Sequence, residues 1–155
     1  LAALFKENWL PSCAAAFRTA TVPGLFFREL PRHIHWSFLA YRLAMAGRRV
    51  GVVLDPGYVI NDTPGSASKS ETYLMCHVDV YERMLEMAPP RHIQEILERR
   101  LAVACHAVSD HFRKEGHFRL AWHWHLRSLS SRFGWQFMSY TRRLVLPERL
   151  NKPSL

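Results

Sequence analysis

The sequence has 155 residues, of which 48% are hydrophobic and 22% are charged. This length allows one domain with a buried core, and the composition excludes an intrinsically disordered chain. The formal net charge is +8, and the longest apolar stretches are Trp36–Ala46 and Val50–Leu54. Both are shorter than the ~20 residues that a membrane-spanning helix needs.

The first half of the chain is expected to combine short strands with one helix. Residues 9–17 are apolar and predict a buried strand, and Val50–Leu54 is rich in β-branched residues and predicts a second one. Between them, Trp36–Ala46 carries apolar residues at helical spacing and predicts a helix that ends at Gly47. A third strand is expected at residues 58–60, before a loop rich in Pro, Gly and Ser that reaches residue 70.

From Glu71 onward the apolar residues recur at helical spacing. Three stripes are visible: Leu74, Val78, Tyr81 and Leu85; then Ile93, Leu97, Leu101, Cys105, Val108 and Phe112; then Phe118, Ala121, Trp122, His125 and Leu129. Pro89-Pro90 closes the first stripe, and Gly116 separates the second from the third, where an antiparallel helix hairpin is expected. A last helix is predicted over Trp135–Leu146.

The positive charge is concentrated in these C-terminal helices. Residues 91–155 contain 12 Lys and Arg against 5 Asp and Glu, a balance of +7, whereas residues 1–90 contain 9 against 8, a balance of +1. A basic helical face is compatible with plain solvation or with contact to an anionic membrane surface. Nucleic-acid binding is not expected, because the aromatic residues between Arg119 and Arg127 fit the buried stripe.

The cysteines and histidines do not form a recognisable metal motif. Cys13, Cys76 and Cys105 lie far apart without a C-x-x-C spacing, which favours buried, reduced thiols in a cytoplasmic protein. His123 and His125 are two residues apart, so on a helix they point about 200° from each other and cannot chelate one ion together. His125 lies on the apolar stripe and is expected to be a core residue.

Two stretches of the first half carry a family resemblance. Leu30-Pro31-Arg32-His33-Ile34-His35-Trp36 opens the predicted helix, and Tyr58-Val59-Ile60-Asn61-Asp62 enters the Pro/Gly/Ser loop. This order resembles the acceptor-side half of family 2 glycosyltransferases, in which the helix begins with Asp-Trp and the strand-loop ends in Tyr-Arg-x-His. The positions of the catalytic Asp and of that His are occupied here by His35 and Asn61.

The resemblance implies an α/β fold. Residues 1–70 would be a partial GT-A-like fragment with a few short strands and a helix, and residues 71–155 would be an all-helical C-terminal extension. The family's metal-binding Asp-x-Asp motif does not occur in this sequence. We therefore expect a donor-binding part to precede Leu1, and the chain is predicted to be an enzyme only together with that part.

The resemblance also assigns roles to five residues. His35 is in the position of the catalytic base, although it could instead cap or pack the helix. Trp36 could present an aromatic face to substrate or could be a core residue, and Ser12 lies in a stretch that leads towards the acceptor site. Asn61 is in the position of the family's His that faces the metal or the diphosphate, and Asp62 beside it is a better ligand for Mg²⁺ or Mn²⁺ than an amide; both are expected to contribute to substrate binding. A divalent metal, Mg²⁺ or Mn²⁺, is expected in the full-length enzyme, with unknown ligands and with none bound by this chain alone.

The function implied is transfer of a sugar from a nucleotide-sugar donor to a glycan or a lipid-linked acceptor. Two alternatives remain open at this point. The chain could be a catalytically inactive relative in which His35 and Asn61 record lost chemistry. It could also be a basic helical interaction module that uses residues 91–146 to dock a partner or the surface of a membrane.

Overall fold

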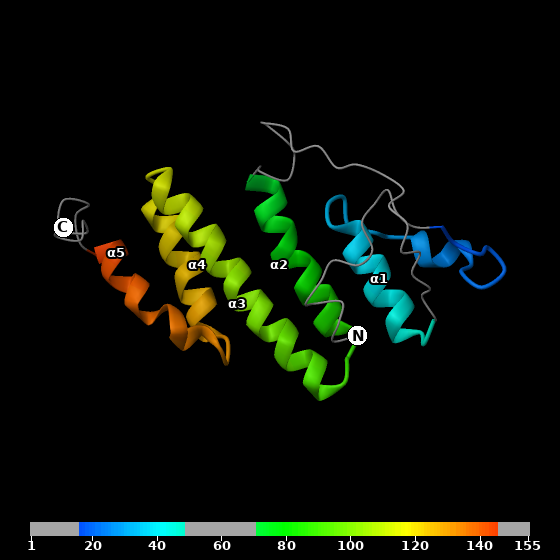
Figure 1. Cartoon of the computed structure of the whole chain (residues 1–155). Helices are drawn as coiled ribbons and strands as arrows, with labels where there is room; N and C mark the ends of the chain where they lie inside the picture. The colour runs from blue at the N-terminus through cyan, green and yellow to red at the C-terminus, as the bar shows by residue number, and fades with distance from the viewer. Residues whose placement is uncertain (1–15, 49–70, 146–155) are drawn as a thin grey trace, which may run out of the picture.

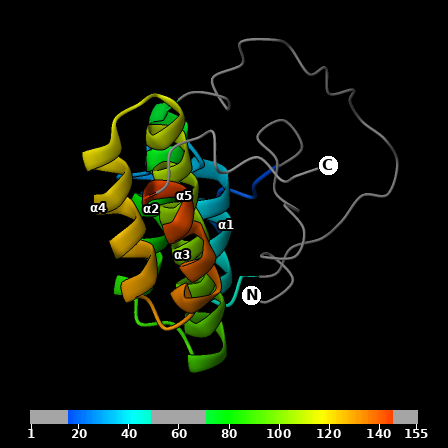
Figure 2. The same ribbon diagram turned by 90° about the vertical axis from the view of Figure 1, so that its left-hand side faces the viewer.

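The computed structural model describes residues 16–48 and 71–145, and every regular element in these two stretches is a helix (Figure 1). The elements are the 3-10 helix η2 (Gly24–Phe27), α1 (His35–Met45), α2 (Glu71–Glu86), α3 (Arg91–Lys114), α4 (Phe118–Ser130), the 3-10 helix η4 (Gly134–Tyr140) and α5 (Thr141–Val145). Helices α1, α2 and α3 follow one another across the molecule, with α4 packed against α3 and α5 at the end opposite α1 (Figures 1 and 2).

The α/β prediction is wrong, because the described residues form an all-helical fold of five α-helices without a strand. In an α/β fold the apolar face of α1 would lie on a sheet. Instead, Phe38, Ala40 and Tyr41 are buried in one cluster with side chains of α2 and α3. The predicted strands at residues 50–54 and 58–60 lie outside the described residues, as does most of residues 9–17. The division of the chain at residue 70 stays a prediction.

Helix α1 ends as its sequence predicts. Gly47 adopts φ +66°, a left-handed conformation that glycine reaches without strain. The Gly47 amide donates to the Ala44 carbonyl at 3.0 Å and the Arg48 amide donates to the Leu43 carbonyl at 2.9 Å. These two bonds form a Schellman motif, which satisfies carbonyls that the helix end would otherwise leave unpaired.

Two apolar clusters hold the helices together. The first joins α1, α2 and the N-terminal half of α3, and its buried members are Phe38, Ala40, Tyr41, Val80, Met84, Ile93 and Leu97. Within it the hydroxyl of fully buried Tyr41 donates to the Met84 carbonyl at 2.9 Å. Burial raises the pKa of Tyr41 to about 12, so the phenol keeps its proton and remains a donor at neutral pH.

The second cluster contains the expected α3–α4 hairpin, which is confirmed (Figure 1). Gly116 has φ +79°, and the amides of Gly116 and His117 donate to Arg113 and Phe112 at 3.1 and 2.8 Å, a second Schellman motif. Across the hairpin, the buried Ser109 hydroxyl donates to the Ala121 carbonyl at 2.7 Å. The turn and this bond together set how α4 lies along α3.

The segment predicted as one helix over Trp135–Leu146 is a 3-10 helix, η4, followed by the short helix α5. Gly134, Phe137 and Tyr140 turn inwards at intervals of three residues, the period of a 3-10 helix, and Leu144 is buried after them. Gly134 is required at the start, because a Cβ there would lie 2.0 Å from the Ser128 carbonyl oxygen.

Two histidines are packed beneath this segment. His125 is fully buried, as predicted, and its Nε2 lies 2.8 Å from the Thr141 hydroxyl. The His106 ring stacks on Phe137 with 4.1 Å between ring centroids. The Nδ1 atoms of both histidines are buried without a partner among the described residues. Burial lowers the pKa of each imidazole below its ordinary value of 6.5.

The first prediction concerns Gly134. Gly134→Ala should destabilise the protein by about 1–3 kcal/mol, because the new methyl group would press on the backbone at the end of α4. Gly24→Ala is the matched control, since a Cβ at Gly24 meets nothing within 4 Å. Chemical denaturation of both variants measures the difference, and equal stability of the two would contradict the close approach.

The second prediction concerns pH. A histidine whose folded pKa is lowered binds fewer protons in the native state than in the unfolded state, so stability falls as the pH drops below 6.5. We expect the free energy of unfolding to decrease between about pH 7.5 and pH 5, and this slope to become shallower in His106→Gln. His123→Gln, at an exposed position of α4, should leave the slope unchanged.

Candidate functional site

The candidate site is the N-terminal turn of α1, which begins at His35. The preceding residue, Ile34, is the N-cap and has φ 59° and ψ 14°, in the left-handed region that a β-branched residue rarely adopts. No side chain hydrogen bond caps the helix at this residue, and the first turn contains no acidic side chain. Strained backbone of this kind persists only where its surroundings enforce it, and it is concentrated at functional sites.

His35 is the first helical residue and is half-buried rather than enclosed. Its ring lies 5.4 Å from the ring of Trp36, at an interplanar angle of 49°. The cap position belongs to Ile34, so the alternative that His35 itself caps the helix is not supported by its place in the structure. Its imidazole can therefore reach a group that approaches the first turn of α1.

Trp36 has the contacts of a core residue. Its ring stacks on Phe17 with 6.0 Å between centroids and an interplanar angle of 10°, and it packs against the first apolar cluster. Phe17 in turn meets the edge of Phe27 at 5.4 Å. One face of the indole is thus covered by Phe17, which supports the structural interpretation of Trp36. Its predicted contact with substrate stays a prediction.

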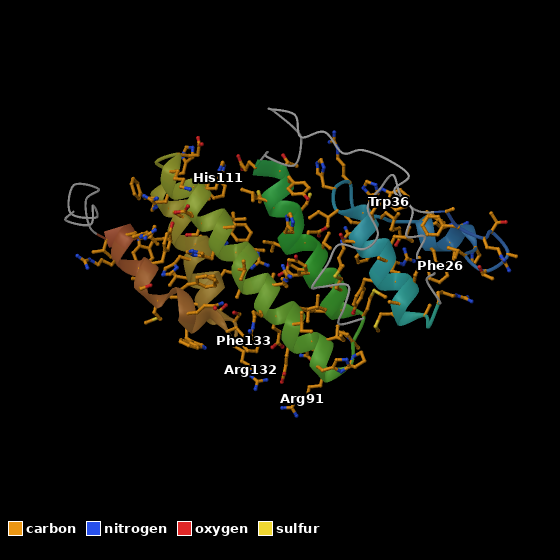
Figure 3. All side chains as sticks on the ribbon, in the orientation of Figure 1. Phe26, Trp36, Arg91, His111, Arg132 and Phe133 are labelled. Atoms are coloured by element: carbon orange, nitrogen blue, oxygen red, sulfur yellow. The ribbon has the colours of Figure 1, made fainter. Side chains whose placement is uncertain are left out.

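Arg42 attaches the segment before α1 to the helix. Its guanidinium donates to the carbonyls of Arg28 and Leu25 at 2.8 and 3.4 Å, and it lies 5.9 Å from the Phe26 ring centroid. Phe26 and Trp36 are labelled on this side of the molecule in Figure 3. These contacts and the stacked Phe17 hold residues 17–28 against α1 and leave the turn at His35 in a defined place.

The other predicted site residues cannot be placed beside His35. Ser12, Asn61 and Asp62 lie outside residues 16–48 and 71–145. Within those ranges no group of three or more His, Cys, Asp or Glu side chains is arranged to hold a metal ion. The predicted roles of Ser12, Asn61 and Asp62 in binding the acceptor or the donor diphosphate, and the Mg²⁺ or Mn²⁺ ion, therefore stay predictions.

The structure also contains a groove that the sequence analysis did not identify. It has a volume of about 440 Å³ and lies between α2, α3 and the end of α4. Its lining residues are Glu82, Glu98, Leu101, Ala102, Cys105, Arg127, Ser130, Ser131 and Arg132. They come from three helices and from the turn after α4, and they show no common spacing, so no sequence motif could have indicated them.

The arginines of this groove are paired within the molecule, and its cysteine is unreactive at neutral pH. Arg127 forms an ion pair with Glu82, and Arg132 forms one with Glu95 at 3.2 Å. Both positive charges of the groove are therefore matched within the molecule. Burial raises the pKa of the Cys105 thiol to about 11, which keeps it protonated and a poor nucleophile at neutral pH. In Figure 3, Arg132 lies well away from Trp36, so the groove is not part of the His35 site.

None of the helices in the described part of the chain is long and apolar enough to cross a bilayer. Comparison of the chain with protein-family models, with curated proteins and with solved structures finds no match.

Proposed function

We propose that this chain is the acceptor-side part of a family 2 glycosyltransferase, which transfers a sugar from a nucleotide-sugar donor to a glycan or a lipid-linked acceptor. The observation that carries the proposal is the position of His35. It stands at the first turn of α1, directly after the strained Ile34, and its ring is only half-buried. The resemblance places the family's catalytic base at this same residue of the helix.

The order of the flanking parts also supports the proposal. A proline-containing segment precedes His35, an apolar helix follows it, and the helix ends at a left-handed Gly47. The proposal concerns this helix and its neighbours and does not extend to an α/β arrangement of the described residues. No residue of this chain is assigned to the donor-binding strands or to the metal ligands, so the proposed activity requires a donor-binding part as well.

In the proposed reaction His35 acts as a general base. Its neutral imidazole accepts the proton of the acceptor hydroxyl while that oxygen attacks the anomeric carbon of the sugar, and the bond from the sugar to the nucleotide diphosphate breaks. A Mg²⁺ or Mn²⁺ ion bound with the donor would stabilise the leaving diphosphate.

The third prediction tests His35 in a protein that includes the donor-binding part. His35→Ala should lower kcat for sugar transfer by roughly 10²- to 10⁴-fold, the usual contribution of a general base, while KM for the acceptor changes little. Arg32→Gln is the matched control, because Arg32 is exposed three residues before His35 and has no assigned role. Transfer is followed with a radiolabelled donor and a panel of glycan and lipid-linked acceptors.

His35→Asp separates an active enzyme from an inactive relative. If the parent protein transfers sugar and His35→Asp keeps or modestly raises the rate, His35 occupies the base position of a working site. If the parent protein is inactive and His35→Asp produces a large gain, the chain is a decayed relative. Equal activity of the parent protein and His35→Ala would remove His35 from the reaction altogether.

A further inference from the structure

We infer that the outer face of η4 and α5 is a docking surface for an anionic membrane. This face, called the basic end face here, consists of Trp135, Met138, Arg142, Arg143 and Val145. The inference stands on these residues alone and does not depend on the proposed sugar transfer.

The first observation is the exposure of the apolar side chains on the basic end face. Trp135 is 73% exposed, Met138 is 61% exposed and Val145 is 64% exposed. No other large hydrophobic side chain of the described residues is as exposed as any of these three. Large apolar side chains mark a surface that contacts something else when they gather in one exposed patch.

The second observation is that these side chains form one stripe. Trp135 and Met138 are three residues apart in a 3-10 helix, so they lie one above the other. Arg142 and Val145 continue the same line at spacings of four and three residues through α5. The opposite side of the segment is anchored in the second apolar cluster by Tyr140 and Leu144. The stripe is therefore presented by a fixed element.

The third observation is the charge around the stripe. From Gly116 to Pro147 the sequence contains no Asp or Glu, and it contains Arg119, Arg127, Arg132, Arg142 and Arg143. Arg127 and Arg132 pair with carboxylates of α2 and α3. Arg142 and Arg143 are exposed, and neither forms an ion pair within the described part of the chain.

The position of the basic end face allows it to meet a flat surface. In Figure 1, α5 lies at the end of the row of helices, opposite α1, and in Figure 2 this end faces the viewer. None of the other described helices lies in front of α5 in that view. A surface that approaches from this end would meet α5, which carries Arg142, Arg143 and Val145, before it meets the other labelled helices.

An anionic bilayer fits this combination better than another molecule does. Tryptophan is enriched at the headgroup level of membranes, and arginine binds the phosphates there while its apolar stem follows the protein surface. A symmetric dimer through the same face would bring the arginine pair of one copy against that of the other, with no carboxylate on the face to neutralise them. Binding to RNA would use the arginines but would leave Met138 and Val145 exposed.

The fourth prediction tests this docking with vesicles. The protein should co-sediment with phosphatidylcholine vesicles that contain about 30 mol% phosphatidylserine, much less with pure phosphatidylcholine, and progressively less as salt is added. Arg142→Gln with Arg143→Gln should weaken the binding roughly 25-fold, on the basis of about fivefold per arginine near a charged surface. Trp135→Ser with Met138→Ser should weaken it roughly tenfold or more, because two inserted apolar groups are lost.

Two matched pairs provide the controls. Arg18→Gln with Arg91→Gln removes the same charge from exposed positions elsewhere. Leu25→Ser with Val103→Ser removes apolar side chains that are 55% and 46% exposed away from the basic end face. Both pairs should bind vesicles nearly as well as the parent protein. Circular dichroism checks that each variant is folded. If the variant with Trp135→Ser and Met138→Ser is unfolded, the variant with Arg142→Gln and Arg143→Gln still tests the inference.

Several results would overturn the inference. One is equal binding to neutral and anionic vesicles, and another is the same loss of binding in a control pair as in its matched test pair. A third is a dimer, detected by light scattering, that Trp135→Ser with Met138→Ser dissociates while vesicle binding is absent. A fourth is tight binding to single-stranded RNA, lost in Arg142→Gln with Arg143→Gln, without vesicle binding. Quenching of Trp135 by brominated lipid, lost in Trp135→Ser, would support insertion.

Discussion

The packing of α3 on both of its sides is the interaction on which the rest of the structure depends. Ile93 and Leu97 in its N-terminal half are buried with residues of α1 and α2, and Cys105, Val108 and Phe112 in its C-terminal half are buried with residues of α4 and the C-terminal segment. Among the helices that the structure describes, no other contributes so many buried residues to both clusters. Hydrophobic burial along this single helix therefore joins the two ends of the molecule.

The two proposed sites lie at opposite ends of this arrangement (Figure 1). The turn at His35 is held by the stacked Phe17 and Trp36 and by the first cluster, whereas Trp135 and Arg142 are held by the anchors of the second cluster. They share no side chain contact among the described residues. Substitutions at one site should therefore act almost independently of substitutions at the other, so each proposal can fail alone.

The C-terminal segment, η4 and α5, is held against α3 and α4 by apolar packing and by the hydrogen bond between His125 and Thr141. Tyr140 and Leu144 bury apolar surface, while His106 and His125 lie beneath the segment with Nδ1 atoms that have no partner among residues 16–48 and 71–145. A neutral imidazole tolerates this burial better than an imidazolium does, because burial penalises the charged form. Protonation of these histidines at low pH should therefore weaken the packing of η4 and α5 on α3 and α4. The opposite, outer side of the same segment carries the basic end face.

The sequence by itself determined where the helices lie and where they stop. The apolar spacing from Trp36 to Ala46 and along residues 71–129 predicts α1 to α4 closely, because a helix must bury one face and leave the other to water. Gly47 and Gly116 marked two helix ends because a left-handed residue is needed there. His125 was recognised as a core residue from its place on the apolar stripe.

Only the tertiary structure decided what covers each apolar face. The sequence of α1 is equally compatible with a sheet and with other helices beneath it, since both offer an apolar surface, and so the α/β prediction failed. Likewise, Trp36 stacks on Phe17 and the groove beside Arg127 forms because separate segments meet in space. Gly134 also lies against the backbone at the end of α4, a close approach that local spacing cannot reveal.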